Sequence, residues 1–158
     1  MLKTDVGTFF DNQAIGEEVF GPSSVVVVCN SREDLLAAAR SLNGQLTATV
    51  HGSPTELDDY ADLFNVLERK AGRILLNGFP TGVEVCDSMT HGGPYPASTD
   101  SRSTSVGTAA IKRFLRPVCY QNFPQAVLPE PLKNKNEHNL WRRIDGTLTR
   151  DDVQEVFG

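Results

Sequence analysis

The run of residues from Ser24 to Cys29 constrains the fold of this chain more than any other feature. It contains four consecutive valines and no charged residue. A continuous β-branched run of this length is typical of a strand buried on both faces, as in a parallel sheet. Ser31 follows, and Asp34 lies three residues later, which is the spacing of a helix N-terminus. The sequence therefore predicts a buried strand followed at once by a helix.

The same alternation continues along the chain. Two further strands are predicted, over Leu46–Val50 and Arg73–Leu76, with a helix over residues 57–71 between them. The apolar side chains of this helix recur with a period of about 3.6 residues. The tetrapeptide Ser53–Glu56 has the capping-box spacing that begins such a helix. Because right-handed crossovers return each strand parallel to the last, this order predicts an α/β fold, a mostly parallel sheet with flanking helices.

Two segments show no such alternation. Residues 1–22 are rich in Gly, Asp and Asn, end in Gly21-Pro22, and are predicted to be irregular. Residues 78–104 are rich in Gly, Pro, Ser and Thr and predict a second, longer loop. A loop of this length inside a compact domain is usually functional. We therefore expect functional residues in it.

The carboxyl-terminal part begins with a short helix predicted around Ser105–Arg113 and a candidate strand from Phe114 to Gln121. Pro117 cannot donate to a strand ladder, so this strand is predicted to lie at a sheet edge or to carry a break. From Phe123 onward the tail is polar and punctuated by proline, with Trp141 as its expected anchor.

Composition narrows the classes of partner. The 158 residues carry a net charge of −5, which argues against binding to a nucleic-acid backbone or an anionic membrane surface. No apolar run is long enough to span a bilayer, and the amino terminus has no apolar signal core. The three cysteines are not a disulfide framework, and they fit a reducing cytoplasm. Cys29 and Cys119 are predicted to be small buried hydrophobes.

Motifs of several common catalytic classes are absent. No glycine-rich phosphate cradle and no serine-hydrolase elbow occurs. The three histidines, His51, His91 and His138, lack metal-ligand spacing, and no cysteine pair has the CxxC spacing, so no metal site is expected. The residues alone therefore give no complete catalytic constellation.

Two segments nevertheless resemble the aldehyde dehydrogenase family. Glu17–Pro22 has the form of the family signature EExFGP, placed just before the predicted buried strand. Asn77–Val85, continued by His91–Pro96, resembles the loop after the family's conserved asparagine, near the carboxyl end of the catalytic domain. This loop and the segment FLRPVCYQNFP look like the α-ketoglutarate-semialdehyde (2,5-dioxovalerate) dehydrogenase branch. The resemblance covers about residues 7–150.

The resemblance implies a domain organisation. Residues 1–112 would be the C-terminal part of the catalytic domain, residues 113–124 an oligomerisation strand, and residues 125–158 a polar C-terminal tail. The nucleophilic cysteine, the base and the dinucleotide-binding fold would lie upstream of the signature, so no catalytic residue is expected in this chain. The expected partners are the upstream regions and a second copy, joined as a dimer or larger oligomer through residues 114–121.

The implied parent enzyme oxidises a small, carboxylated aldehyde or semialdehyde to the acid with NAD or NADP. Stable binding of the cofactor to this chain alone is not expected. An alternative from another class remains open, in which the segment is a non-enzymatic α/β assembly or binding module.

The resemblance also implies roles for particular residues. The carboxylate of Glu18 would accept hydrogen bonds from the nicotinamide ribose, and the ring of Phe20 would pack beside it. Thr81, Val83 and His91 would line the aldehyde pocket. By residue type alone, Glu18 is a solvated loop carboxylate, Phe20 a core side chain and His91 a structural residue, and these interpretations stay open.

Because the family's nucleophile motif does not occur in these 158 residues, we expect the isolated chain not to oxidise aldehydes. Without a positioned thiolate no covalent intermediate forms. NAD(P)H absorbance with short semialdehydes, at high protein concentration, measures this. Turnover that is lost in Cys86→Ala would contradict the prediction, because Cys86 would then be a nucleophile.

Overall fold

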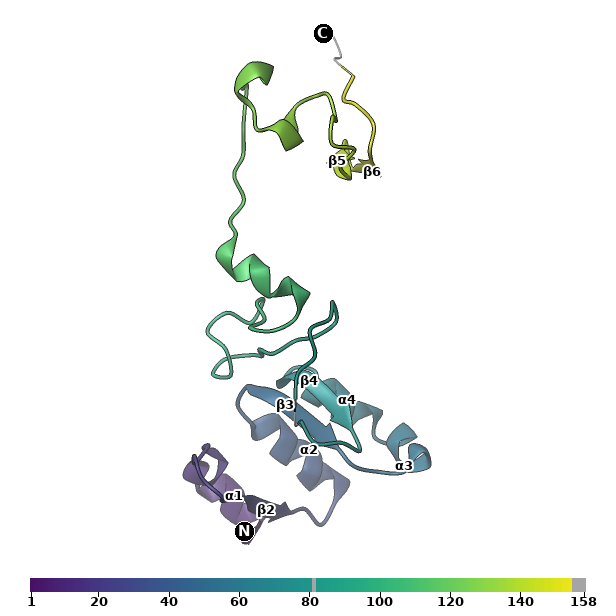
Figure 1. Cartoon of the computed structure of the whole chain (residues 1–158). Helices are drawn as coiled ribbons and strands as arrows, with labels where there is room; N and C mark the ends of the chain where they lie inside the picture. The colour runs from purple at the N-terminus through teal and green to yellow at the C-terminus, as the bar shows by residue number, and fades with distance from the viewer. Residues whose placement is uncertain (81, 155–158) are drawn as a thin grey trace. The chain divides into compact units, whose positions relative to one another are not determined.

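Two units make up the chain in the computed structural model, which describes residues 1–80 and 82–154. The first unit is Met1–Leu115 and the second is Arg116–Gly158. The described strands form short parallel and antiparallel pairs, and helices accompany them, so the chain is mixed α/β (Figure 1).

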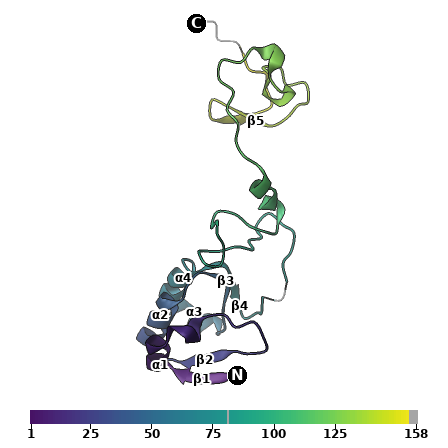
Figure 2. The ribbon, with the colours of Figure 1, turned by 90° about the vertical axis from the view of Figure 1, so that its left-hand side faces the viewer.

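The centre of the first unit is a pair of parallel strands, β3 (Gln45–Val50) and β4 (Ala71–Leu76). Helices α2 (Arg32–Ser41) and α4 (Ala61–Leu67) lie side by side on one side of this pair (Figure 2). The core forms where the helices meet the strands, from Leu36, Ala39, Leu63 and Leu67, with Ala48, Val50 and Ile74 packed against them. The predicted helix–strand–helix–strand order and the apolar face of the second helix are confirmed.

Hydrogen bonds of local side chains explain where two helices begin. Ser31 Oγ accepts a hydrogen bond from the N–H of Asp34 at 3.0 Å and so caps α2. At the start of α3 (Pro54–Asp58), Ser53 Oγ accepts from the N–H of Glu56, and Glu56 Oε2 accepts from the N–H of Ser53 at 2.8 Å. The bonds from Ser53 lower the pKa of the Glu56 carboxyl. The predicted capping box is confirmed.

The prediction of one continuous helix over residues 57–71 is wrong, because α3 and α4 are separate helices. The break lies at Tyr60, whose backbone leaves the helical region at φ −112° and ψ +28°. Arg32 of α2 contacts Tyr60 at this break and Asp62, which follows it in α4. Its guanidinium lies 5.2 Å from the centre of the Tyr60 ring and 2.7 Å from Asp62 Oδ1, and this bond lowers the pKa of Asp62.

The prediction that the amino-terminal residues are irregular is wrong. β1 (Leu2–Asp5) and α1 (Val6–Asp11) precede β2 (Val25–Val28), and β1 pairs with β2 in parallel. Asp5 accepts hydrogen bonds at 2.9 Å from both the backbone N–H and the hydroxyl of Thr8, and these bonds lower the pKa of Asp5. This cap was the local signal for α1.

The valine-rich run does form a strand, but the strand is not buried on both faces. Val25 is 41% and Val26 39% exposed. The strand pairs β1–β2 and β3–β4 are separate two-stranded sheets in the described chain, so the expected single parallel sheet is not formed. The valine run has the composition of a buried strand, but no layer of the described residues covers both of its faces. Cys29, which was predicted to be buried, is half-buried. Its burial and, to a lesser degree, the negative charge of Asp34 raise the pKa of its thiol.

Residues 114–121 form no strand within the described part of the chain. They are exposed throughout, so the prediction of a buried Cys119 is wrong. A strand requires a pairing partner, and Pro117 removes one donor. The short helix expected just before this segment is confirmed as a 3₁₀ helix, η2 (Thr108–Phe114).

The second unit contains an antiparallel hairpin of β5 (Arg142–Ile144) and β6 (Thr147–Thr149). The turn residues Asp145 and Gly146 have φ of +48° and +83°, as a two-residue Asp-Gly turn requires. Two 3₁₀ helices precede it, η3 (Gln125–Val127) and η4 (Glu130–Leu132). The Asp-Gly pair was a hairpin signal that the sequence reasoning missed.

Trp141 is not a buried anchor of this unit, because it is 59% exposed. The Arg150 guanidinium lies 4.5 Å from the centre of its ring. Arg142 instead ties the unit together, since its guanidinium donates to the backbone carbonyls of Lys133, Asn134 and Asp151. No helix in the described ranges is long and apolar enough to cross a membrane.

Candidate functional site

The loop of residues 78–104 starts from a fixed point at Asn77. The Asn77 side chain accepts from the N–H of Gly52 and donates to the Gly52 carbonyl, both at 2.9 Å. The backbone N–H of Asn77 also donates to the Val50 carbonyl at 2.9 Å. Asn77 has a φ of +50°, which asparagine tolerates better than most residues. These bonds join the ends of β3 and β4 and set where the loop departs.

Glycines bring the same loop against the strand pair. A Cβ added at Gly72 of β4 would lie 2.0 Å from the Gly92 carbonyl oxygen. One added at Gly93 would lie 2.3 Å from the Gln45 carbonyl oxygen at the start of β3. Backbone approaches this close exclude any side chain, so glycine is required at both places. The loop therefore packs on the strands through its backbone.

His91, one of the predicted pocket residues, is held by its backbone. Its N–H donates to Thr104 Oγ1 at 2.8 Å, and its carbonyl accepts from the N–H of Ser105 at 3.0 Å. Thr104 is buried, and its hydroxyl donates in turn to the Val106 carbonyl at 2.7 Å. The ring atom Nδ1 of His91 is buried and has no hydrogen-bond partner in the described chain. An unpaired buried nitrogen is costly, and this sets His91 apart from the other polar side chains that line the loop.

An open hollow of about 420 Å³ lies beside His91. Its lining is mostly polar and includes His91, Ser98, Asp100, Ser103, Ser105 and Arg113. Such a combination of hydroxyls, an imidazole and a guanidinium can donate hydrogen bonds to the oxygens of a small ligand.

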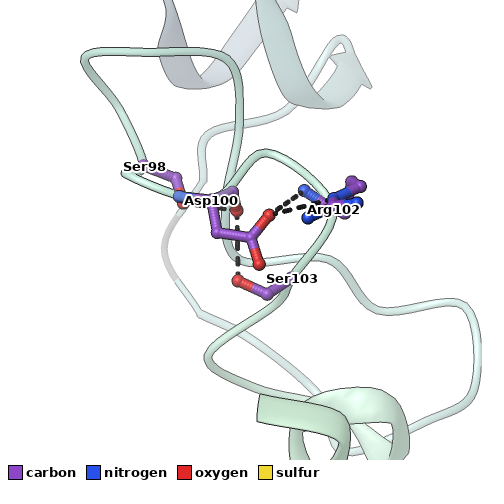
Figure 3. Close-up of polar contacts among 4 residues, drawn as sticks. All are labelled: Ser98, Asp100, Arg102 and Ser103. Carbon is purple, nitrogen blue, oxygen red and sulfur yellow. Dashed lines mark hydrogen bonds and ion pairs between the residues drawn. The ribbon is translucent and has the colours of Figure 1, made fainter. Parts of the chain in front are cut away.

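Asp100 organises one wall of the hollow through local bonds (Figure 3). Its backbone carbonyl accepts from the hydroxyls of Ser98 at 2.8 Å and Ser103 at 3.1 Å. Its carboxylate accepts from the N–H of Arg102 at 3.0 Å and lies 3.5 Å from Arg102 Nε. The Arg102 side chain is 91% exposed, so this ion pair contributes little to stability. The hydrogen-bonded turn around Asp100, rather than its ion pair with Arg102, therefore determines the shape of this wall.

Thr81 and Val83 are the other two predicted pocket residues. Thr81 lies outside the described residues. Val83 is 41% exposed and is not part of the hollow's lining, so the structure does not join it to His91 there. Arg73 of β4 donates from Nη1 to the Gly82 carbonyl at 2.9 Å, directly beside Val83. Sequence reasoning missed both Arg73 and Thr104, because their contacts are long-range in the chain.

Glu18 and Phe20, the predicted cofactor residues, lie between the 3₁₀ helix η1 (Gln13–Gly16) and β2. Both are exposed, and the Phe20 ring is 93% exposed. The core-packing interpretation of Phe20 is therefore wrong. A ring this exposed contacts little of the chain, so the structure does not join it to the hollow at His91. Gly21 has a φ of +154°, a backbone conformation that residues with a side chain rarely adopt. This conformation explains why the signature has a glycine at this position.

Cys86 is half-buried, and its thiol lies 3.5 Å from the hydroxyl of Ser88. A serine hydroxyl is not a base that could activate a thiol. In residues 1–80 and 82–154, no group of three or more His, Cys, Asp or Glu could hold a metal ion.

The sequence is similar to two known enzymes over most of its length. It is 53% identical over 140 residues to an alpha-ketoglutaric semialdehyde dehydrogenase of Acinetobacter baylyi, which covers 89% of this chain and 27% of that enzyme. It is 50% identical over 138 residues to alpha-ketoglutaric semialdehyde dehydrogenase 2 of Azospirillum brasilense, or 87% of this chain and 26% of that enzyme. The chain is related to the aldehyde dehydrogenases. No family model matches it.

The resemblance inferred from the EExFGP signature and the loop after Asn77 is thus confirmed, together with its semialdehyde dehydrogenase branch. The chain spans about a quarter of the length of these relatives, and the match fits a C-terminal segment of such a dehydrogenase.

Replacing Gly72 by alanine should displace the loop from the strands. The added methyl group would overlap the Gly92 carbonyl, and overpacking of this kind typically costs about 1–3 kcal/mol of unfolding free energy. Gly78→Ala is the matched control, since its Cβ would lie 3.7 Å from the Leu76 carbonyl oxygen, an ordinary contact. Urea unfolding followed by circular dichroism compares the two variants. Equal stabilities would show that the loop does not pack on β4 in this way.

Proposed function

We propose that this chain forms one side of the cofactor site and part of the aldehyde pocket of an NAD(P)-dependent semialdehyde dehydrogenase. The reaction would be oxidation of a small, carboxylated aldehyde to the acid. The observation that carries the proposal is the 53% identity over 140 residues with a semialdehyde dehydrogenase. The nucleophile, the base and the dinucleotide-binding fold would come from the rest of that enzyme.

The exposed position of the signature residues supports the cofactor part of the proposal. Glu18 offers an exposed carboxylate, the acceptor that a ribose diol requires. The Phe20 ring offers a flat apolar wall, and a large apolar side chain this exposed indicates a surface that another group covers. The nicotinamide, when bound, would supply the hydride acceptor, and these two residues would hold its ribose and ring.

The hollow beside His91 supports the aldehyde part. The Nδ1 atom of His91 is buried and has no hydrogen-bond partner among the described residues, and Arg113 and several hydroxyls share the lining of the hollow. The Asp100 carboxylate in the same lining is engaged by Arg102, so Arg113 and the hydroxyls remain as donors for a ligand that carries a carboxylate and a carbonyl. Val83, exposed on the same loop, would contribute apolar surface to the pocket.

The cofactor role is testable in a complete dehydrogenase in which this chain replaces the matching segment of the Acinetobacter baylyi relative. Glu18→Gln should weaken the hydrogen bonds to the ribose, because a neutral amide replaces a charged acceptor. Hydrogen bonds to charged groups contribute roughly 1.5–3 kcal/mol, so kcat/KM for the cofactor should fall about tenfold or more. Glu17→Gln, one residue away, is the matched control and should leave this value unchanged. Equal effects of the two changes would return Glu18 to a solvated loop carboxylate.

We also propose that residues 114–121 join two copies of the chain. Several of their apolar side chains are exposed, among them Phe114 at 82%, Leu115 at 64% and Val118 at 55%. Their backbone makes no strand ladder in the described chain, and such unpaired backbone seeks another strand.

The chain should therefore sediment as a dimer or larger oligomer whose mass depends on concentration. A charge in the middle of the proposed interface, in Val118→Asp, should shift the protein towards monomer. Val127→Asp is the matched control, because Val127 is 63% exposed but lies outside the segment. A monomer at all concentrations, measured by sedimentation velocity, would show that this segment does not self-associate.

A further inference from the structure

Arg73 has an unusual environment for a cation. It lies in β4 between Gly72 and Ile74, and Ile74 packs against the helices. Because side chains alternate along a strand, Arg73 points to the face that the helices leave uncovered. It is only partly exposed, and none of the ion pairs in the described chain includes it. Its Nε is buried and has no hydrogen-bond partner there.

The guanidinium instead contacts two points of the loop. Nη1 donates to the Gly82 carbonyl at 2.9 Å and lies 3.6 Å from the sulfur of Met89. Gly82 adjoins Val83, and Met89 lies two residues before His91. The two contacts therefore lie next to the two described residues expected to face the aldehyde, one beside Val83 and the other two residues before His91.

A buried charge without a counter-charge is costly, whereas an apolar side chain would fill the same space at lower cost. A charge-assisted hydrogen bond to a carbonyl is, however, stronger than a neutral one and fixes a backbone position. An aldehyde pocket depends on such fixed positions. A small displacement of its wall moves the bound aldehyde out of the geometry that the reaction requires, and the reaction then becomes slower.

We propose that Arg73 is a positioning residue of the aldehyde pocket, which it shapes by clamping the loop at Gly82 and Met89. This inference rests on the proposed function, since it assigns Arg73 to the same site. Arg73 itself touches neither the aldehyde nor the cofactor. It acts through Val83 and His91.

The clamp can be tested in the 158-residue chain by hydrogen exchange. Arg73→Met keeps most of the stem but removes the donor to Gly82. The backbone N–H groups of Cys86 and Met89 donate to carbonyls within the loop, at 3.1 Å and 3.3 Å, and they report on its order. We expect these amides to exchange about tenfold faster in Arg73→Met, a loss of the size that follows from one charge-assisted hydrogen bond.

Lys70→Met is the matched control. Lys70 is also a half-buried cation that donates to a backbone carbonyl, that of Leu42 at 2.6 Å, and in the described chain its side chain makes no hydrogen bond to the loop. Its loss should leave the exchange of the loop amides unchanged. Equal exchange of these amides in the wild-type chain and Arg73→Met would overturn the clamp.

The positioning role is tested in the complete dehydrogenase that carries this chain. In Arg73→Met, KM for the semialdehyde should rise about tenfold, while KM for the cofactor should stay within about twofold. Arg73→Lys, which keeps the charge and one donor, should recover most of the aldehyde KM. Equal rises in both KM values would overturn the positioning role. If the unmodified enzyme does not oxidise the semialdehyde, the proposed function fails, while the exchange measurement still decides the clamp.

Discussion

The packing of α2 and α4 against the β3–β4 pair is the interaction on which the rest of the first unit depends. It contains four of the buried apolar side chains, from Leu36 on α2 to Leu67 on α4. The Arg32–Asp62 bond ties the two helices at their exposed edge, where it adds orientation more than stability. Once the helices cover one face of the pair, its ends and its other face remain for the loop of residues 78–104. The core therefore decides where that loop can pack.

The rest of the chain's apolar surface is not covered in this way. Val25 and Val26 of β2, Phe20 of the signature and the exposed segment 114–121 all present apolar side chains to solvent. Isolated exposed side chains are ordinary, but here they coincide with unpaired strand edges and with a family signature. This coincidence agrees with the proposal that other regions of a larger enzyme, and a second copy of the chain, cover these surfaces.

Local signals in the sequence predicted local structure well. The Ser31 cap, the capping box at Ser53 and the apolar face of α4 are encoded within a few residues, and the structure contains all three. Predictions that needed a distant partner were less reliable. The predicted strand at residues 114–121 is not formed in the described chain, where it has no partner to pair with, and the valine run lacks a covering layer.

The candidate site shows the same division. His91 could be predicted from its resemblance to a family motif, but its fixation by Thr104 joins residues 13 positions apart, and the Arg73–Met89 contact joins residues 16 apart. No sequence pattern predicts such contacts. The glycines of the loop could be seen in the sequence, and two of them, Gly92 and Gly93, lie where the loop approaches the strands most closely.

The two halves of the proposed site differ in how much of their geometry this chain provides. The aldehyde side is fixed within the first unit, at Asn77 where the loop starts, at the Arg73 contacts, and at His91 through Thr104. The cofactor side has less support within the described chain, because Phe20 is almost fully exposed and the backbone hydrogen bonds there lie at either end of the signature, at Glu17 and Ser24. A binding site gains affinity when its groups are ordered before the ligand arrives. Under the proposed function, the aldehyde pocket wall would thus be largely preformed in this chain, whereas the ribose site would acquire its order only when the cofactor-binding region of the enzyme packs against the signature.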